Sequence, residues 1–358
     1  MEEQVSDVLD DLAQPPSARP TLDEVARHAG VSRATVSRVV NGGAGVREAM
    51  RAQVERAVAE LGYVPNQAAR TLVTRRHDAV GVVIAEPEAR VFSDPFFAQH
   101  LRGISRELSA AGLQLVLLLV DDGDYQRVGR YLAGGHVDGL LLFSLHANDP
   151  LPAMARGAGL PTVIGGRPDW PGADTDRSLL SVDTDNRGGA RLAVQHLLDR
   201  GCRRIATVTG PLDQTSSTDR LAGYRDLLPF AAPSLVAEGD FTPEGGRNAM
   251  ALLLERHPDL DGVFAASDVM ATAAMSVLRA AGRRVPEDVA VVGFDDLDSV
   301  APWSDPPLTT IRQDIEEMGR LMARLLLARL QPGPDGADAA TTPHSVVMPT
   351  RLVVRASA

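Results

Sequence analysis

The chain has 358 residues, of which 44% are apolar, a formal net charge of −11 and a single cysteine, Cys202. This length predicts two or three domains, and one cysteine excludes an intramolecular disulfide and a cysteine-based zinc site, so Cys202 is expected to be a buried bystander. The first residues are acidic and polar and the apolar runs are only strand-length, which predicts a cytoplasmic protein with no signal peptide and no membrane segment.

Charge is distributed unevenly along the chain. Residues 1–19 carry one arginine and five acidic side chains, a net charge of −4, whereas residues 20–77 carry nine arginines and five acidic side chains, a net charge of +4. We interpret residues 1–19 as a disordered acidic tail. One basic module in an acidic chain indicates that contact with nucleic acid is confined to that module.

The segment TLDEVARHAGVSRATVSRVVN has the pattern of two helices joined by a tight turn. Thr21 and Glu24 form a capping box, and Gly30 permits the turn. A third helix is predicted over Arg47–Leu61, with a core stripe of Met50, Val54, Ala57, Val58 and Leu61. Short polar side chains and arginines at the start of the second helix suit a major groove. We therefore predict a helix-turn-helix DNA-binding domain over residues 20–64; the alternative is a helical hairpin of another all-α domain.

Residues 65–78 follow, beginning PNQAARTLVTRR. Residues 67–73 are long enough for about two helical turns, which are unstable alone in water because nucleation costs more than so few hydrogen bonds return. We predict a hinge helix that becomes ordered only when it docks. A flexible linker is the alternative.

From residue 79 onward, buried strand runs alternate with helical stretches. The strand runs are AVGVVIA, LQLVLLLV, DGLLLFS and PTVIGG, and then RRIATVTG, SLVAEGDF, DGVFAAS and DVAVVGFDD. The predicted helices lie near Phe96–Ala111, Tyr125–Ala133, Pro152–Ala158, Arg187–Arg200, Asp219–Leu228, Pro243–His257 and Val269–Ala281. This alternation predicts an α/β fold with two doubly wound parallel sheets.

Two such sets predict two lobes with a cleft between them. The helix Ile315–Leu330 and the strand run HSVVMPTRLVVRA have no lobe of their own, so they are expected to cross back, one to each lobe. We expect the first lobe to comprise residues 79–179 with 312–340, and the second lobe to comprise residues 180–311 with 341–358.

Eight stretches in this order resemble the lactose-repressor and galactose-repressor (LacI/GalR) family of bacterial transcription regulators. They are the helix-turn-helix, the hinge GYVPNQAARTL, DPFF at 94–97, SVDTDNRGG at 181–189, TGP at 209–211, ASDVMA at 266–271, VVGFDD at 291–296 and PPLTTIRQD at 306–314. The resemblance implies a homodimer on double-stranded DNA. Each subunit would offer an all-α headpiece, a hinge helix and a two-lobed sensor like a periplasmic sugar-binding protein.

By this resemblance, Arg33 and Ala34 occupy the two positions that set half-site preference. Arg33 can pair with guanine, although a phosphate contact is the alternative, and Ala34 can contact a thymine methyl. Arg38 is a second candidate base reader. The remaining candidates for DNA contact in the headpiece, chiefly to phosphates, are Thr21, Ser32, Thr35, Ser37 and Asn41.

The hinge would enter the minor groove by the same resemblance. Leu72 stands where the family inserts a leucine between central base pairs and kinks the duplex; a core leucine is the alternative. Ala69 is small enough for the groove floor, and Asn66 would begin the helix or hold a phosphate. Two-fold symmetry then predicts a palindromic operator.

The resemblance also implies a small polar effector in the cleft, most simply a sugar. In DPFF the carboxylate would accept hydroxyl hydrogens and the aromatic pair would stack on a sugar ring. The candidate effector-binding residues are Asp94, Phe96, Phe97, Arg167, Ser216, Arg220, Phe241, Ser267, Asp295 and Gln313. For Phe97 a core position is the alternative. Asp183, Asp185 and Asn186 are expected to cap the helix near Arg187.

Two departures from the family pattern bear on the effector. Gly166 stands where several sugar-binding relatives have an aspartate, so one hydroxyl contact is lost. Gln214 stands where the purine-sensing relative has an arginine, which weakens the prediction of a nucleobase effector.

The resulting prediction is a repressor of carbohydrate-utilisation genes, located in the cytoplasm at the nucleoid and controlled allosterically by the effector. An activator, a co-repressing ligand and a non-sugar effector are alternatives within the same chemistry.

An α/β enzyme is a more remote alternative. The chain has no lysine and hence no P-loop lysine, and it lacks G-x-G-x-x-G after a strand and G-x-S-x-G. The histidines 100, 136, 146, 196 and 257 show no metal-ligand spacing, and most are expected at the surface. The sequence indicates no catalytic residue, no metal and no cofactor. An exported sugar-binding protein is disfavoured by the fused headpiece.

Overall fold

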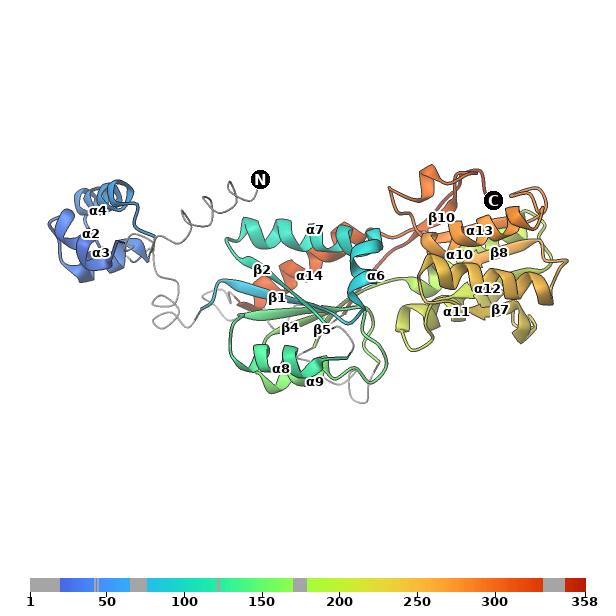
Figure 1. Cartoon of the computed structure of the whole chain (residues 1–358), viewed down its shortest axis with the longest axis horizontal. Helices are drawn as coiled ribbons and strands as arrows, with labels where there is room; N and C mark the ends of the chain where they lie inside the picture. Colours follow the sequence, from blue (N-terminus) through green and yellow to red (C-terminus); the bar gives the residue numbers. More distant parts are fainter. Residues whose placement is uncertain are drawn as a thin grey trace, which may run out of the picture. The chain divides into compact units, whose positions relative to one another are not determined.

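The computed structural model describes residues 20–41, 43, 45–64, 76–120, 123–169, 179–330 and 345–358. The predicted tail and the hinge segment 65–75 lie outside these residues. The chain forms two compact units, Met1–His77 and Asp78–Ala358, which we call the headpiece and the sensor (Figure 1).

In the residues that the structure describes, the headpiece forms three helices. Its helices are α2 (Leu22–His28), α3 (Arg33–Val40) and α4 (Glu48–Leu61). The capping box is confirmed, because the Thr21 amide donates to the Glu24 carboxylate at 2.7 Å and the Glu24 amide donates to Thr21 Oγ1 at 3.3 Å. Gly30 adopts a φ of 61° at the turn, as its position predicted. The three helices meet around Val25, Val36 and Val54, whose side chains are fully buried.

The first lobe of the sensor is built on a six-stranded parallel sheet in the order β11-β5-β4-β3-β1-β2. Its strands are β1 (Ala79–Ile84), β2 (Gln114–Leu119), β3 (Gly139–Phe143), β4 (Thr162–Gly165), β5 (Leu180–Thr184) and β11 (Ser345–Met348). Helices α7 (Pro95–Ala110) and α14 (Ile315–Leu330) cover one face, and α8 (Tyr125–Ala133) and α9 (Leu151–Gly157) cover the other (Figure 1). The Val and Leu runs of β1 and β3 are therefore buried on both sides.

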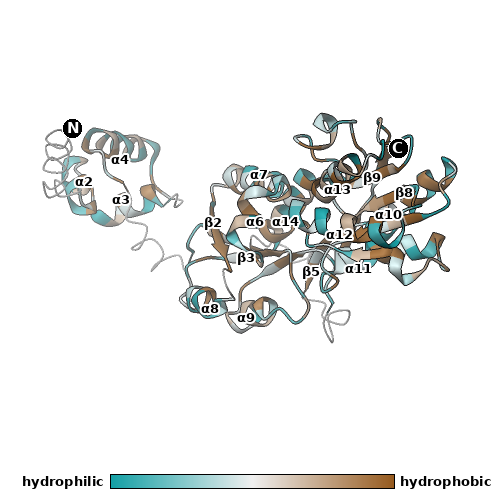
Figure 2. Cartoon of the chain, turned by 45° about the vertical axis from the view of Figure 1, so that its right-hand side comes forward, coloured by the Kyte–Doolittle hydropathy of each residue, from teal (hydrophilic) through white to brown (hydrophobic). Residues whose placement is uncertain are grey.

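The second lobe repeats this plan with the order β12-β10-β9-β8-β6-β7, in which only β12 is antiparallel. Its strands are β6 (Ile205–Thr209), β7 (Val236–Glu238), β8 (Gly262–Ala265), β9 (Ala290–Asp295), β10 (Thr309–Arg312) and β12 (Arg351–Val353). Its helices are α10 (Asn186–Asp199), α11 (Thr215–Leu227), α12 (Pro243–Arg256) and α13 (Asp268–Ala280). Helices α12 and α13 pack on one face and α10 and α11 on the other. In Figure 2 strand β8, inside this sheet, is coloured mainly hydrophobic.

The boundary between the lobes differs from the expected one. Strand β5 begins at Leu180 but pairs with β4, so it belongs to the first sheet. The C-terminal strand run divides into β11, in the first sheet, and β12, in the second. The expected change of lobe at residue 180 and the assignment of residues 341–358 to the second lobe alone are therefore wrong. The chain changes lobe three times, after β5, β10 and β11.

The exposure of three side chains differs from the sequence prediction. Met50, expected in the headpiece core, is 39% exposed. Cys202 is half-buried, and its sulfur lies 3.4 Å from the carbonyl oxygen of Asp261. His100 is fully buried. Of the five histidines expected mostly at the surface, His136 is exposed and His146, His196 and His257 are partly exposed, so His100 is the one that departs from the expectation.

Helices α7 and α14 cross so closely that glycine is required at the contact. A Cβ added at Gly103 would lie 2.0 Å from the Glu316 carbonyl oxygen, and one added at Gly319 would lie 2.3 Å from the His100 carbonyl oxygen. Both obstacles are backbone atoms, which cannot rotate away. This crossing fixes α7, and with it the residues at the start of α7, relative to the first sheet.

We expect Gly103→Ala to lower the free energy of unfolding by about 1–3 kcal/mol, because the added methyl group overpacks the crossing. Gly157→Ala is the matched control, since that helical glycine faces open space and alanine favours a helix by about 0.5–1 kcal/mol over glycine. Urea denaturation of both variants measures the effect. Equal stability of the two variants would contradict the close crossing.

Candidate functional site

A cleft lies between the two lobes, where the carboxyl ends of both sheets face each other. Asp183 and Thr184 end β5, Asp295 ends β9, and Ser267 follows β8. The cleft holds about 1020 Å³ of empty space, including the part that is open to solvent. It lies where α/β sheets bind ligands, at the carboxyl ends of the strands.

The structure brings nine of the ten predicted effector-binding residues to this cleft. They are Asp94, Phe96, Arg167, Ser216, Arg220, Phe241, Ser267, Asp295 and Gln313. Phe97 is the exception, because its side chain is fully buried in the core of the first lobe. The prediction that Phe97 stacks on the ligand is wrong, and the core alternative holds.

Two of these nine residues also cap helices. The Asp94 carboxylate accepts a hydrogen bond from the Phe96 amide at 3.0 Å at the start of α7. Ser267 Oγ accepts from the Met270 amide at 3.2 Å at the start of α13. Capping fixes both side chains at the edge of the cleft. Asp185 caps α10, as predicted.

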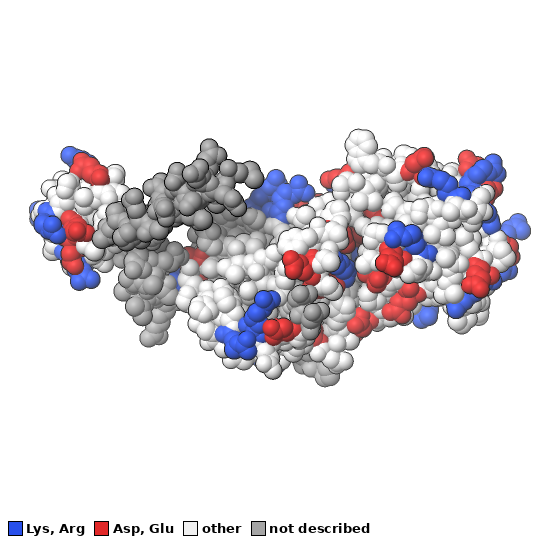
Figure 3. Space-filling model, viewed as in Figure 1, with Lys and Arg blue, Asp and Glu red and all other residues white. Residues whose placement is uncertain are grey.

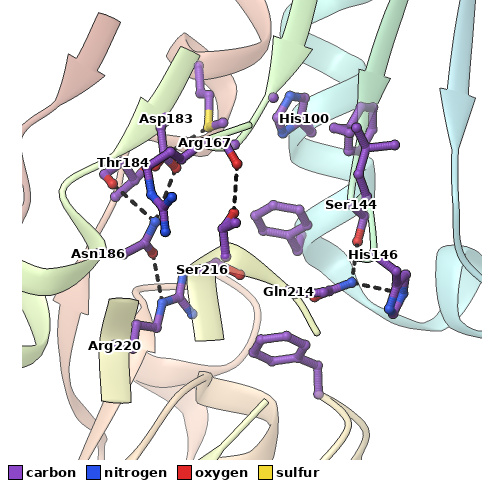
Figure 4. A pocket seen from close by; sticks show the side chains of 18 of the residues that line it. His100, Ser144, His146, Arg167, Asp183, Thr184, Asn186, Gln214, Ser216 and Arg220 are labelled. Carbon is purple, nitrogen blue, oxygen red and sulfur yellow. Dashed lines mark hydrogen bonds between the residues drawn. The ribbon is translucent and has the colours of Figure 1, made fainter. Parts of the chain in front are cut away.

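Arg220 is the central cation of the cleft and is almost wholly buried. Its Nε donates to Asn186 Oδ1 at 2.9 Å, and a terminal nitrogen donates to the Ala266 carbonyl oxygen. The same end lies 3.7 Å from the Asp295 carboxylate. Asn186 in turn donates to Asp183 at 3.1 Å (Figure 4). The sequence predicted only a capping role for Asn186, yet it lines the cleft and orients Arg220.

Burial raises the pKa values of several carboxyl groups in the cleft. Burial raises the pKa of Asp295 to about 7, although the charge of Arg220 opposes the increase. Burial also raises the pKa of Asp183 to about 6 and that of Asp94 above its ordinary value. The carboxyl groups of Asp183 and Asp295, with these pKa values, can both accept and donate hydrogen bonds near neutral pH, which suits the mixed donors and acceptors of a hydroxyl-rich ligand.

Three cleft residues other than glycine have a left-handed backbone. Ser144 has a φ of 59°, Phe241 of 64° and Asp295 of 115°. Such conformations cost of order 1–3 kcal/mol each and persist where the surrounding structure imposes them, often at functional sites. The strain therefore marks the loops that follow β3, β7 and β9 as a functional region.

Aromatic side chains form the apolar walls of the cleft. Phe96 comes from α7, and Phe241 follows β7 in the opposite lobe. His100 stacks on Phe143 with ring centroids 4.3 Å apart and an interplanar angle of 10°. Burial lowers the pKa of His100 to about 3, so this imidazole is neutral and belongs to the wall. Faces of this kind suit the C–H surface of a sugar ring.

A hydrogen-bonded network joins the lobes at the cleft (Figure 4). Glu86, which follows β1, is only 3% exposed. Its carboxylate accepts from Ser144 Oγ at 2.5 Å and from Gln214 Nε2 at 2.7 Å, and Gln214 belongs to the second lobe. Gln214 Nε2 also lies 3.0 Å from His146 Nε2. A buried carboxylate whose partners come from both lobes favours contact between them.

Two further contacts join the lobes beside this network. His146 Nδ1 lies 2.9 Å from Asp213 of the second lobe. Arg167 pairs with Asp219 through two hydrogen bonds of 3.0 Å each. Arg167 was predicted to face the ligand, and the structure shows that this cleft residue also bridges the lobes.

Sequence reasoning missed Glu86, Ser144 and His146 and gave Gln214 only a negative role. One signal was available, since Glu86 and Ser144 each directly follow a buried strand, where residues of a parallel sheet face its ligand edge. Nothing in the sequence indicates that these residues meet Gln214.

The pKa values in this network depend on contact between the lobes. Burial alone would raise the pKa of Glu86, but hydrogen bonds from His146 and Ser144 and the charge of Arg90 hold it below its ordinary value. The hydrogen bond to Glu86 and that to Asp213 raise the pKa of His146 to about 9 against the effect of burial. His146 is therefore protonated at neutral pH and pairs with carboxylates of both lobes.

We expect His146 to contribute pH-dependent stability. Its pKa in the folded chain lies above its ordinary value near 6.5, so the stabilisation is complete below that pH and is lost as the pH rises through about 9. Urea denaturation of the parent and His146→Gln from about pH 6 to about pH 10 measures this. The difference in stability should shrink over the window; a constant difference would show that the imidazolium is not involved.

In the headpiece, α3 exposes the predicted DNA-contacting residues. Arg33, Ala34 and Arg38 are exposed, whereas Val36 and Val39 on the other side are buried. Arg33 Nε lies 3.6 Å from Asp23, with both side chains largely exposed, so this ion pair is weak. The exposed polar face of α3 is the surface that a recognition helix presents to a groove.

The polar candidates of the headpiece are held close to the start and end of α3. Ser32 Oγ accepts from the Thr35 amide at 3.2 Å, and Asn41 Nδ2 donates to Ser37 Oγ at 3.3 Å. Thr21 caps α2. The candidates Asn66, Ala69 and Leu72 lie outside the described residues.

Charges on the sensor are mixed in sign. Figure 3 shows basic and acidic side chains interspersed over its visible face. Arg187 and Asp226 form one ion pair of the sensor, at 2.6 Å. Within the described residues, no helix is both long and apolar enough to cross a bilayer. No group of three or more His, Cys, Asp or Glu side chains in that part of the chain is placed to hold a metal ion.

Comparison with known proteins gives a consistent result for both units. Residues 21–66 match the model of "Bacterial regulatory proteins, lacI family", and residues 194–358 match that of a "Periplasmic binding protein-like domain". The chain is similar to the HTH-type transcriptional regulator CelR of Thermobifida fusca, with 51% identity over 344 residues that cover 95% of this chain and 98% of the relative.

Two solved structures resemble the whole fold. One is a transcriptional regulator CelR–cellobiose complex, with a TM-score of 0.72 and 48% identity, covering 95% of this chain and 100% of that one. The other is the lac repressor dimer bound to operator and the anti-inducer ONPF, with a TM-score of 0.79 and 27% identity, covering 95% and 99%. The predicted headpiece with a two-lobed sensor is confirmed by these matches.

Proposed function

The chain belongs to the LacI family of bacterial regulatory proteins, and we propose on that basis that it is a dimeric cytoplasmic repressor of carbohydrate-utilisation genes that responds to a neutral sugar. Membership makes it a DNA-binding transcriptional regulator and not an enzyme, as the sequence predicted. The dimer, the location and the identity of the sugar are the proposed parts.

The charge balance of the cleft is the observation that supports a neutral ligand. Each of its three lining arginines is held by a carboxylate. The pairs are Arg90–Glu86 at 2.5 Å, Arg167–Asp219 at 3.0 Å and Arg220–Asp295 at 3.7 Å. Asp94 and Asp183 add further carboxyl groups. An anionic ligand would meet no excess of positive charge among the described lining residues, whereas a polyol finds donors, acceptors and aromatic faces.

Similarity favours a β-linked glucose disaccharide, because a CelR relative that is 48% identical has been solved with cellobiose. We infer that cellobiose or a closely related oligosaccharide is the effector. The nine predicted residues that line the cleft, together with Asn186 and Gln214, would contact it.

In the proposed mechanism, residues 20–64 bind half-sites of a palindromic operator, and residues 65–78 connect them to the sensor. A ligand that contacts both lobes changes their relative angle only through its different affinity for the two arrangements. That change would order or melt the hinge segment, in which Leu72 is the proposed minor-groove wedge.

Leu72→Ala should then weaken operator binding strongly, and unchanged affinity would refute the wedge.

Selection of operators from random duplex DNA, repeated in the presence of individual sugars, tests the proposal. We expect a palindromic consensus whose binding changes with cellobiose and not with ribose or glucose 6-phosphate. Loss of binding identifies an inducer, and a gain identifies a co-repressor. Binding without sequence preference, or without response to any neutral sugar, would refute the proposed function.

A further inference from the structure

Arg90 is a cleft residue that neither the sequence pattern nor the family resemblance singled out. It lies on α6 (Glu88–Ser93), a short helix between β1 and α7. Its side chain is only 12% exposed and lines the cleft. One terminal nitrogen lies 2.5 Å from the buried Glu86 carboxylate, one turn earlier in the chain. This ion pair fixes one edge of the guanidinium.

The same guanidinium lies over aromatic rings of both lobes. Its central carbon lies 5.5 Å from the ring centroid of Phe97 in the first lobe and 5.0 Å from that of Phe241 in the second. Both distances fall within the usual range of cation–π contacts. Arg90 therefore joins the wall of one lobe to that of the other, at a point where the chain takes a left-handed backbone at Phe241.

Part of the guanidinium has no hydrogen-bond partner in the portion of the chain that the structure describes. Arg90 Nε is buried and donates to no acceptor among the described residues. A guanidinium carries five N–H groups, and a buried donor without an acceptor is unfavourable. Since Glu86 already neutralises the charge, the missing acceptor need not be an anion. Nε itself has almost no accessible surface, so a hydroxyl, ring or glycosidic oxygen of a ligand would reach the guanidinium through the part of the side chain that is exposed in the cleft.

We propose that Arg90 binds the effector and determines its specificity by donating to one oxygen of a neutral sugar, with Glu86 as the positioning residue. This inference rests on the proposed sugar-responsive function. The contact with Phe241 means that the donor is in place only when the lobes meet. A sugar that lacks the matching oxygen would leave the Arg90 donor unpartnered in the joined lobes and would bind weakly.

Calorimetric titration of the full-length protein with cellobiose and its monodeoxy derivatives tests Arg90. For the parent, we expect one deoxy sugar to bind about tenfold or more weakly than cellobiose. Arg90→Met, which keeps a long side chain, should bind cellobiose and that deoxy sugar alike. Arg90→Lys should retain only part of the discrimination, because ammonium donors cannot reproduce the guanidinium geometry. Arg130→Lys, an exposed arginine of the same lobe, is the matched control.

The outcomes separate this inference from the proposed function. Failure of the parent to bind any neutral sugar refutes the function itself. If the parent binds but Arg90→Met weakens all sugars by the same factor, the residue is only structural and the inference is wrong. If Arg90→Met does not fold, as thermal unfolding would show, the ratio of affinities in Arg90→Lys decides: an unchanged ratio refutes the inference and a reduced one supports it.

Discussion

Replacing Arg220 with methionine is expected to lower the free energy of unfolding by about 3–5 kcal/mol and to abolish the response of operator binding to the effector. Arg220 is nearly inaccessible to solvent, and its guanidinium lies 3.7 Å from both the Asp295 carboxylate and the ring centroid of Phe294. Methionine would fill much of the space but would leave Asp295 without a counter-charge. The side-chain oxygen of Asn186 would also lose the hydrogen bond that it accepts from Arg220.

The loss of unfolding free energy in Arg220→Met should depend on pH. Burial already raises the pKa of Asp295 to about 7, and the charge of Arg220 opposes this increase. In Arg220→Met the Asp295 pKa should rise further, so the carboxyl group is neutral at lower pH and charged only above the raised value. The destabilisation should therefore be smaller near pH 5 than near pH 8.

Urea denaturation at the two pH values measures the effect, and operator binding with and without cellobiose measures the response. Arg187→Met is the control, because it removes an equally charged but exposed arginine that pairs with Asp226, so we expect little change. If Arg220→Met were as stable as this control and still responsive, the central role of Arg220 would be excluded.

Arg33→Ala is expected to weaken binding to the selected operator by about 10- to 100-fold, the range of a lost bidentate contact with guanine. Arg33 is the first residue of α3 and is exposed. Its pair with Asp23 spans 3.6 Å between two exposed side chains, so little stability is lost when DNA replaces it.

Fluorescence anisotropy with the selected operator and with single-base variants separates the two possible roles of Arg33. A base reader loses discrimination at one position, whereas a phosphate contact weakens all sequences about equally. Arg56→Ala, an exposed arginine on α4, is the control because it makes the same change in charge. Uniform loss across all duplexes in Arg33→Ala would assign Arg33 to phosphate.

Most of the elements were predictable because local rules and the global fold agree. The runs of β1 and β3 are apolar throughout and are buried on both faces, and capping residues mark the starts of α2, α3 and α13. Strand β5 was missed because its sequence, LSVDT, contains too many polar residues to predict a buried strand. All five of its residues are nevertheless buried. Helix α6, with six residues, is too short to show a periodic pattern.

The candidate site was predictable only where one side chain could be assigned from its own segment. Phe97, His100, Ile104 and Leu108 are all fully buried and follow helical spacing along α7, but the family motif assigned Phe97 to the ligand and His100 was expected at the surface. The contact between Glu86 and Gln214 was not predictable, because the two residues come from different lobes. Their contacts depend on the relative placement of two sheets, which no local pattern encodes.

The order of the strands has a consequence for biosynthesis. β11 and β12, the edge strands beside β5 and β10, are supplied by residues 345–353. Until these residues leave the ribosome, the nascent chain carries two incomplete sheets with unpaired edges, which are templates for association with other chains. The headpiece emerges first and can fold early. A ribosome-bound chain could thus bear a DNA-reading domain well before its metabolite receptor is finished, and chaperones would meet it in that interval.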